Sequence, residues 1–245
     1  MTDDLLERDP KPPTRRYPKA APWGIRFYQR LTRTILRVIT TLEVTGLERV
    51  PRTGPLVIAF NHLSYLDGPV LFGILPRNDI TSVVGALMAK NPAIKFLIEQ
   101  TGGIWIERGG SDREAIRAVL AELQAGRAVI VSPEGRISTT GQLIQAQRGP
   151  IFLADRAGAA ILPVAMVGVA SILPNVMKFR RTPVTVHIGH PITVAADSGG
   201  NHKGRIQEAT DQLMAELASM LPPDYRGHYA DATPPQDKSA NAASA

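Results

Sequence analysis

A histidine and an aspartate five residues apart, His62 and Asp67, are the residues of this sequence best suited to acid–base chemistry. They belong to the segment NHLSYLD, which directly follows the apolar run Leu56–Phe60. In a turn between a strand and a helix, the chain can fold back so that the carboxylate reaches the imidazole. A neutral histidine oriented by a carboxylate can remove a hydroxyl proton while that oxygen attacks a carbonyl carbon. The alternative is that Asp67 only caps the helix that Gly68 and Pro69 begin.

Basic residues follow other apolar runs, at places where a parallel sheet would gather them. Arg108 ends the segment GGIWIER, Arg136 lies with Glu134 and Gly135 in the segment SPEGRIS, and Lys90 follows the run Ile80–Val84. Because the carboxyl ends of parallel strands meet at one edge of a sheet, these residues are expected at the edge that carries His62. Guanidinium groups match phosphate oxygens bidentately, so Arg108 and Arg136 predict a phosphate-binding site, with Lys90 as a further candidate. The alternative is that each is a solvated surface charge.

Short β-branched runs alternate with helical stretches along the middle of the chain. The runs expected to form strands are Leu56–Phe60, Ile80–Val84, Ile104–Ile106, Ala128–Val131, Ile161–Val167 and Val184–Ile188. Apolar strands separated by helices indicate an α/β domain with a largely parallel sheet covered on both faces. The clearest helix is Ser111–Ala125, for which Ser111 and Glu114 predict a capping box and Gly126 a stop.

The segment Pro22–Thr41 has the pattern of an amphipathic helix with a basic stripe. Its arginines, spaced four, three and four residues apart, are Arg26, Arg30, Arg33 and Arg37. Its apolar residues are Trp23, Phe27, Tyr28, Leu31, Ile35 and Val38. This combination is typical of a helix that lies in a bilayer interface. The alternative is a helix packed on the domain with its arginines in water.

The composition of the chain excludes several kinds of functional site and of targeting segment. The 245 residues carry a formal net charge of +6 and include no cysteine, which excludes disulfides, thiolate metal sites and cysteine nucleophiles. The positive charge suits a nucleic acid, an anionic membrane or an anionic substrate equally well. No run of about 18 apolar residues occurs, so no spanning helix is expected. The acidic N-terminal segment does not predict a secretory signal. The expected organisation is a disordered tail (1–21), an interfacial helix (22–41), one domain (42–220) and a second disordered tail (221–245).

Four blocks taken in order, NHLSYLD, GGIWIERG, SPEGRIS and ILPV, resemble the ordered motifs of the PlsC-type glycerolipid acyltransferase family, the 1-acyl-sn-glycerol-3-phosphate acyltransferases and their relatives. The resemblance extends from about Leu47 to Ile192. It implies a single α/β domain with a mixed, mostly parallel sheet flanked by helices. It also implies acyl-CoA or acyl-carrier protein as the donor, with no metal and no cofactor.

The resemblance further implies roles for individual residues. His62 corresponds to the catalytic base and Asp67 to its partner, while Arg108 and the Glu134–Gly135 turn, with Arg136 nearby, correspond to the phosphate site of the acceptor. The third block departs from the common pattern Glu-Gly-Thr-Arg-Ser, because Arg136 lies two residues after Glu134 instead of three. In this respect it is similar to acyltransferase domains that act on other lysophospholipids, including lysophosphatidylethanolamine.

The sequence thus predicts an O-acyltransferase of phospholipid biosynthesis whose acceptor is lysophosphatidate (1-acyl-sn-glycerol-3-phosphate). Its expected partners are a membrane lipid surface, an acyl thioester donor and a lysophospholipid acceptor, and its expected place is peripheral, on the cytoplasmic face of the membrane. The alternatives are another acceptor (glycerol-3-phosphate, lysophosphatidylethanolamine or a glycolipid) and a catalytically silent membrane-binding relative. A nucleic-acid partner is not expected, because the arginines fall on one helix and on isolated strand ends without a known nucleic-acid motif.

Overall fold

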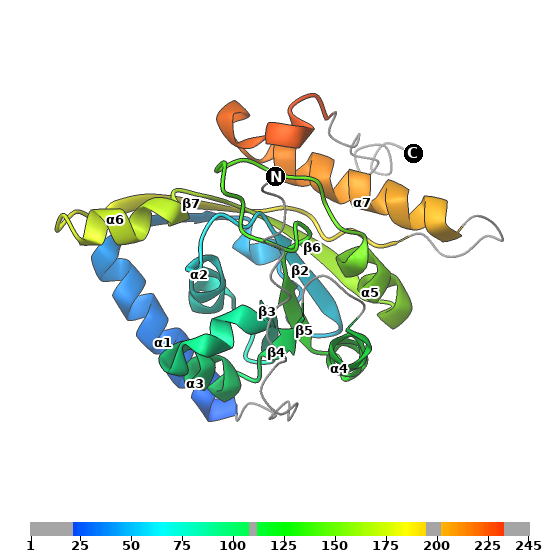
Figure 1. Cartoon of the computed structure of the whole chain (residues 1–245), viewed down its shortest axis with the longest axis horizontal. Helices are drawn as coiled ribbons and strands as arrows, with labels where there is room; N and C mark the ends of the chain where they lie inside the picture. Colours follow the sequence, from blue (N-terminus) through cyan, green and yellow to red (C-terminus); the bar gives the residue numbers. More distant parts are fainter. Residues whose placement is uncertain (1–21, 108–111, 195–201, 233–245) are drawn as a thin grey trace, which may run out of the picture.

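A seven-stranded sheet forms the centre of the molecule, with strands in the order β1-β7-β6-β2-β5-β3-β4 (Figure 1). The computed structural model describes residues 22–107, 112–194 and 202–232, without the side chains of Pro22 and Trp23. The strands are β1 (Thr40–Thr45), β2 (Leu56–Phe60), β3 (Ile80–Gly85), β4 (Ile104–Ile106), β5 (Ala128–Val131), β6 (Ala160–Val167) and β7 (Thr182–Ile188). Neighbouring strands are parallel except β6 and β7, which are antiparallel. The predicted mixed, mostly parallel sheet is therefore confirmed.

Helices cover both faces of this sheet, as the apolar strands predicted. They are α1 (Pro22–Ile39), α2 (Asp67–Ile74), α3 (Pro92–Gln100), α4 (Arg113–Gln124), α5 (Gly149–Ala157), α6 (Ile172–Val176) and α7 (His202–Ser219). Short 3₁₀ turns are η1 (Leu47–Arg49), η2 (Ala86–Lys90), η3 (Val169–Ser171), η4 (Pro223–Tyr225) and η5 (Gly227–Tyr229). Side chains of β2 alternate between two separate cores. Leu56, Ile58 and Phe60 pack with α2, whereas Val57 and Ala59 pack with α4, α5 and α7. Burial on both sides explains why the strand reads as a continuous apolar run.

The helix at the start of the described chain is shorter than predicted. Helix α1 ends at Ile39, and Thr40 already pairs with Thr182 of β7. The sequence pattern predicted no strand here and placed Thr40 and Thr41 in the helix. The β-branched Thr40 and Thr41 instead join an edge strand, which suits their restricted side-chain rotamers.

Helix α1 has three distinct sides. A buried side of Ile25, Gln29, Thr32 and Leu36 packs on the domain, and Nε2 of Gln29 donates to the carbonyl oxygen of Arg77 at 2.8 Å. The arginines of the predicted basic stripe are exposed, and the outward side presents Phe27, Leu31, Ile35 and Val38 to solvent. No helix in the described ranges is both long enough and apolar enough to cross a bilayer.

Two further boundaries in the structure differ from the predicted ones. Helix α4 is capped by Asp112, whose Oδ1 accepts from the N–H of Ala115 at 3.1 Å, and the predicted cap Ser111 lies outside the described residues. Residues 221–232 include η4 and η5 and pack on the domain, so the prediction of a disordered tail is wrong for them. The prolines there act as turn residues, and Leu221 is only 2% exposed. The remaining tail predictions, 1–21 and 233–245, concern residues that the structure does not describe.

Candidate active site

His62 and Asp67 lie where the central strand β2 gives way to helix α2. The Nδ1 atom of His62 is 2.8 Å from Oδ2 of Asp67, which confirms the predicted contact between the two side chains. A carboxylate only accepts hydrogen bonds, so in the neutral imidazole the ring proton is on Nδ1 and Nε2 carries the lone pair. Asp67 is fully buried, whereas the His62 side chain remains 19% exposed. This pair combines an oriented imidazole with a ring that is partly exposed.

The turn between the two residues wraps around the carboxylate. Oδ2 of Asp67 also accepts from the main-chain N–H groups of Leu63 and Ser64, both at 2.8 Å. Asp67 is the first residue of α2, and the cap position belongs to Leu66. The alternative interpretation of Asp67 as a helix cap is therefore wrong. Its carboxylate holds the preceding turn and the imidazole in one arrangement.

Glu134, from the segment after β5, supports the main chain of His62. Its Oε1 accepts from the N–H of His62 at 2.8 Å, and its Oε2 accepts from the N–H of Ile144 at 3.1 Å. The N–H of Ser138 donates in turn to the carbonyl oxygen of His62 at 2.8 Å. Gly135 has a φ of +67°, a left-handed conformation that glycine adopts without steric cost. Strands β2 and β5 are neighbours, which is why residues 72 positions apart meet here.

Burial changes the titration of Glu134. Desolvation raises the pKa of this carboxyl from 4.5 to about 6, although the hydrogen bonds from His62 and Ile144 act in the opposite direction. Both oxygens face main-chain donors, so the carboxylate itself is not presented to a substrate. Any part of this turn in binding an acceptor would fall to the Gly135 main chain and to Arg136.

Two of the three predicted cationic residues lie in the part of the chain that the structure describes. Arg136 is exposed two residues after Glu134, and Lys90 is exposed at the end of η2, the 3₁₀ turn that follows β3. Arg108 lies outside the described residues. The structure thus brings Asp67 and Glu134 into direct contact with His62, whereas the phosphate site formed by the arginines stays a prediction.

Asn61 was not singled out in the sequence, yet it fixes the end of β2. Its Nδ2 donates to the carbonyl oxygen of Met166 at 2.8 Å, and its Oδ1 accepts from the N–H of Met166 at 2.7 Å. The side chain is 1% exposed and joins β2 to β6 just before the His62–Asp67 turn. A polar residue between an apolar strand and the histidine is the signal that could have indicated this role.

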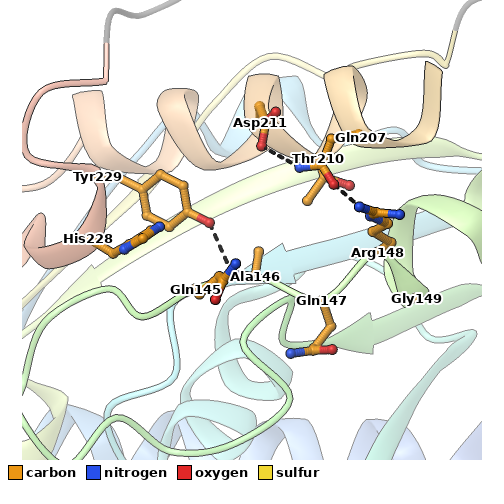
Figure 2. A pocket seen from close by; sticks show the side chains of 10 residues that line it. All are labelled: Gln145, Ala146, Gln147, Arg148, Gly149, Gln207, Thr210, Asp211, His228 and Tyr229. Carbon is orange, nitrogen blue, oxygen red and sulfur yellow. Dashed lines mark hydrogen bonds between the residues drawn. The ribbon is translucent and has the colours of Figure 1, made fainter. Parts of the chain in front are cut away.

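The C-terminal segment binds the loop of residues 143–146, which contains Ile144, the main-chain partner of Glu134. The N–H of Leu143 donates to the carbonyl oxygen of Tyr225 at 2.8 Å, and the N–H of His228 donates to the carbonyl oxygen of Leu143 at 3.0 Å. The N–H of Ala146 donates to the hydroxyl of Tyr229 at 3.0 Å, and Figure 2 shows this ring pointing at the loop. A cavity of about 520 Å³ lies here, between the loop and α7. Its walls are mainly polar, among them Gln145, Arg148, Gln207 and Asp211, so it does not suit an acyl chain.

The raised pKa of Glu134 predicts a specific pH dependence of stability. Between pH 4.5 and about 6 the folded chain retains the Glu134 proton that the unfolded chain has already lost. The free energy of unfolding should therefore fall by about 2 kcal/mol as the pH rises through this window. Glu134→Gln should lack this decrease, because glutamine does not ionise. Denaturant unfolding of both proteins from pH 4 to pH 7 measures the difference.

Glu208, an exposed residue of α7, provides the matched control for this measurement. Glu208→Gln should keep the wild-type slope. An unfolding free energy of Glu134→Gln that runs parallel to that of the wild type across the window would contradict the assignment.

Known proteins share both the sequence pattern and the fold described above. The sequence model of the acyltransferase family matches residues 41–167. A lyso-ornithine lipid O-acyltransferase of Pseudomonas aeruginosa is 35% identical over 143 residues, which cover 56% of this chain and 54% of that protein. A 1-acyl-sn-glycerol-3-phosphate acyltransferase of Chlamydomonas reinhardtii is 26% identical over 203 residues, 79% of this chain and 57% of that protein. The chain thus spans only about half the length of these relatives.

Among solved structures, the 1-acyl-sn-glycerophosphate acyltransferase PlsC of Thermotoga maritima has the same fold. It superposes with a TM-score of 0.60 over 76% of each chain, at 22% identity. The matched family region begins within β1 and ends with β6, and it contains the His62–Asp67 pair and the Glu134 turn. The chain therefore belongs to the acyltransferase family and shares the fold of its PlsC-type members.

Proposed function

We propose that this protein transfers a fatty acyl group from an acyl thioester, acyl-CoA or acyl-carrier protein, to the free hydroxyl of a lysolipid. The single observation that carries the proposal is the hydrogen bond between Nδ1 of His62 and the buried carboxylate of Asp67. It leaves Nε2 as a base at the carboxyl edge of the sheet, where α/β proteins bind their ligands. No metal or resident cofactor is part of the proposed reaction.

The proposed reaction uses the acceptor's own hydroxyl as the nucleophile. Nε2 of His62 takes the hydroxyl proton as the oxygen bonds to the thioester carbon, and Asp67 stabilises the imidazolium that forms. Main-chain N–H groups would stabilise the tetrahedral oxyanion. When the carbon–sulfur bond breaks, the proton on His62 passes to the departing thiolate. The products are an ester and a free thiol, and His62 is neutral again.

Lysophosphatidate is the first candidate acceptor. Relatives named 1-acyl-sn-glycerol-3-phosphate acyltransferases support it. A lyso-ornithine lipid is a second candidate, favoured by the 35% identity to the Pseudomonas protein. The position of Arg136, two residues after Glu134, also favours an acceptor other than lysophosphatidate. Glycerol-3-phosphate, lysophosphatidylethanolamine and a glycolipid are the remaining acceptors of the same reaction class.

We also propose that the protein works from the cytoplasmic face of a membrane as a peripheral protein. Helix α1 supports this placement, because its outward side is apolar and its four arginines are exposed beside it. Each arginine near an anionic leaflet would contribute on the order of 1 kcal/mol of binding free energy. The acceptor and the product, both lipids, would then be reached without leaving the bilayer surface.

A panel of acceptors tests the proposed reaction. The chain is incubated with palmitoyl-CoA or palmitoyl-acyl-carrier protein and one acceptor at a time, and lipid products are identified by mass spectrometry. We expect one acylated product that forms in proportion to the free thiol. The acceptor with the highest kcat/KM identifies the substrate, and the two donors are compared in the same way. Thiol release without any acylated lipid, or no reaction with any acceptor, would favour a catalytically silent relative and refute the proposal.

A further inference from the structure

Helix α6 and the turn that follows it present large apolar side chains to solvent. Leu173 is 56% exposed, Met177 83% and Phe179 99%. A methionine and a phenylalanine this exposed within three residues are unusual on a protein surface, where apolar patches mark contact sites. The segment is more than 130 residues from α1 in the sequence.

The backbone holds the ring of Phe179 outward at a conformational cost. Phe179 has a φ of +55° and is the one non-glycine residue in a left-handed conformation among residues 22–107, 112–194 and 202–232. Bulky side chains disfavour this region, so the surrounding turn must impose it. Asn175 fixes the turn, because its carbonyl oxygen accepts from the N–H groups of Lys178 and Arg180, both at 2.9 Å. A turn built only for connection would more easily place glycine at this position.

The charged residues within the turn all have the same sign. Lys178, Arg180 and Arg181 are exposed next to the apolar side chains, and no Asp or Glu occurs between Asp155 and Asp197 in the sequence. Apolar residues surrounded by cations match an anionic bilayer, which offers both acyl chains and negative headgroups. Two copies of the chain meeting through this surface would instead bring like charges together.

Arg181 connects the turn to the C-terminal end of α1. Its Nη2 donates to the carbonyl oxygen of Arg37 at 2.8 Å, and its Nε donates to that of Thr40 at 3.1 Å. Figure 1 shows α6 beside this end of α1. The outward side of α1 ends with Val38, which is 68% exposed. The guanidinium group of Arg181 therefore links the turn to the end of α1 at which Val38 lies.

We propose that the turn 173–180 is a second bilayer-contact element, in which Met177 and Phe179 insert between acyl chains and Lys178 and Arg180 bind anionic headgroups. Together with α1 it would give the protein two separated contacts and hence a defined orientation on the membrane. This proposal rests on the proposed placement of the chain at a membrane and does not depend on the proposed reaction.

Vesicle binding of the full chain tests the proposal. Affinity is measured by co-sedimentation with vesicles of phosphatidylcholine alone and of phosphatidylcholine with phosphatidylglycerol. Phe179→Asn should weaken binding to the mixed vesicles roughly tenfold, as expected for one large apolar side chain. Asparagine tolerates the left-handed backbone, so the Tm of this variant should not fall. Lys178→Gln combined with Arg180→Gln should lower only the part of the affinity that depends on phosphatidylglycerol, roughly fivefold per residue.

Leu47→Ser is the matched control, because Leu47 is an exposed apolar residue in η1, at the opposite end of β1. It should bind vesicles as the wild type does. Unchanged vesicle binding by Phe179→Asn would overturn the proposal. Lipid-free dimers of the wild type that Phe179→Asn abolishes would assign the surface to a second copy and also overturn it. Vesicle binding requires no turnover, so a negative result in the acceptor panel would leave this test unaffected.

Discussion

Replacing His62 with alanine should reduce the rate of acyl transfer by about 100- to 10,000-fold, the usual contribution of a general base. The physical reason is that Nε2 of His62 is the atom proposed to take the hydroxyl proton, and alanine cannot accept it. The loss should appear in kcat, since the side chain is not proposed to bind either substrate before reaction. Initial rates with a saturating donor and the best acceptor of the panel measure it.

Folding of this variant should be little affected. The contacts between His62 and the Glu134 segment come from its main chain, which alanine retains. Its Tm is therefore expected to stay close to that of the wild type, apart from the loss of one hydrogen bond to Asp67. His190→Ala is the matched control. His190 is exposed beyond the end of β7, which β6 separates from β2 in the sheet. Activity of His62→Ala within tenfold of the wild type would refute the proposed mechanism.

Asp67→Asn should also lower kcat, by roughly 100- to 10,000-fold, because the imidazolium would lose its negative partner. The substitution removes the negative charge while the hydrogen bonds to the side chain can be retained. An asparagine oxygen in the place of Oδ2 can accept from His62, Leu63 and Ser64 as the carboxylate does. The amide nitrogen then takes the place of Oδ1, a buried atom that makes no hydrogen bond within the described part of the chain. The reverse placement would set the amide N–H groups against the main-chain donors.

The expected cost of Asp67→Asn in stability is that of one unpaired buried amide, about 1–3 kcal/mol. Thermal unfolding and kcat are therefore measured on the same preparation. Asp224→Asn, an exposed substitution in η4, controls for the loss of a carboxylate elsewhere. Full activity of Asp67→Asn would mean that the carboxylate only shapes the turn, and that His62 needs no charged partner.

Contacts close together in the sequence were the most predictable ones. The strands β2, β4 and β5 have the predicted bounds, because each is a short apolar run between turn residues. The His62–Asp67 contact was also predictable, since a strand-to-helix turn leaves few ways for five residues to fold back. Boundaries with competing signals were less predictable. Thr40 and Thr41 continue the amphipathic pattern of α1, yet pairing with β7 makes them a strand.

Contacts between distant segments could not be predicted from local pattern. Glu134 was assigned to a substrate site, but its carboxylate accepts from His62 and Ile144 because β5 lies beside β2 in the sheet. The order of strands is a property of the whole fold, and no local pattern encodes it. For the same reason Asn61, which binds Met166 across the sheet, and Arg77, whose side chain is completely buried, had no signal of comparable strength.

The hydrogen bonds between the C-terminal segment and residues 143–146 have a consequence for folding during translation. The His62–Asp67 turn is encoded within six consecutive residues, but Ile144, which binds Glu134, belongs to a loop whose neighbours are bound by Tyr225, His228 and Tyr229. During translation these partners leave the ribosome long after the histidine does. A nascent chain would thus have the contacts of Asp67 but not a fixed Glu134 segment for most of synthesis, and the proposed activity should arise only after residue 229 has emerged.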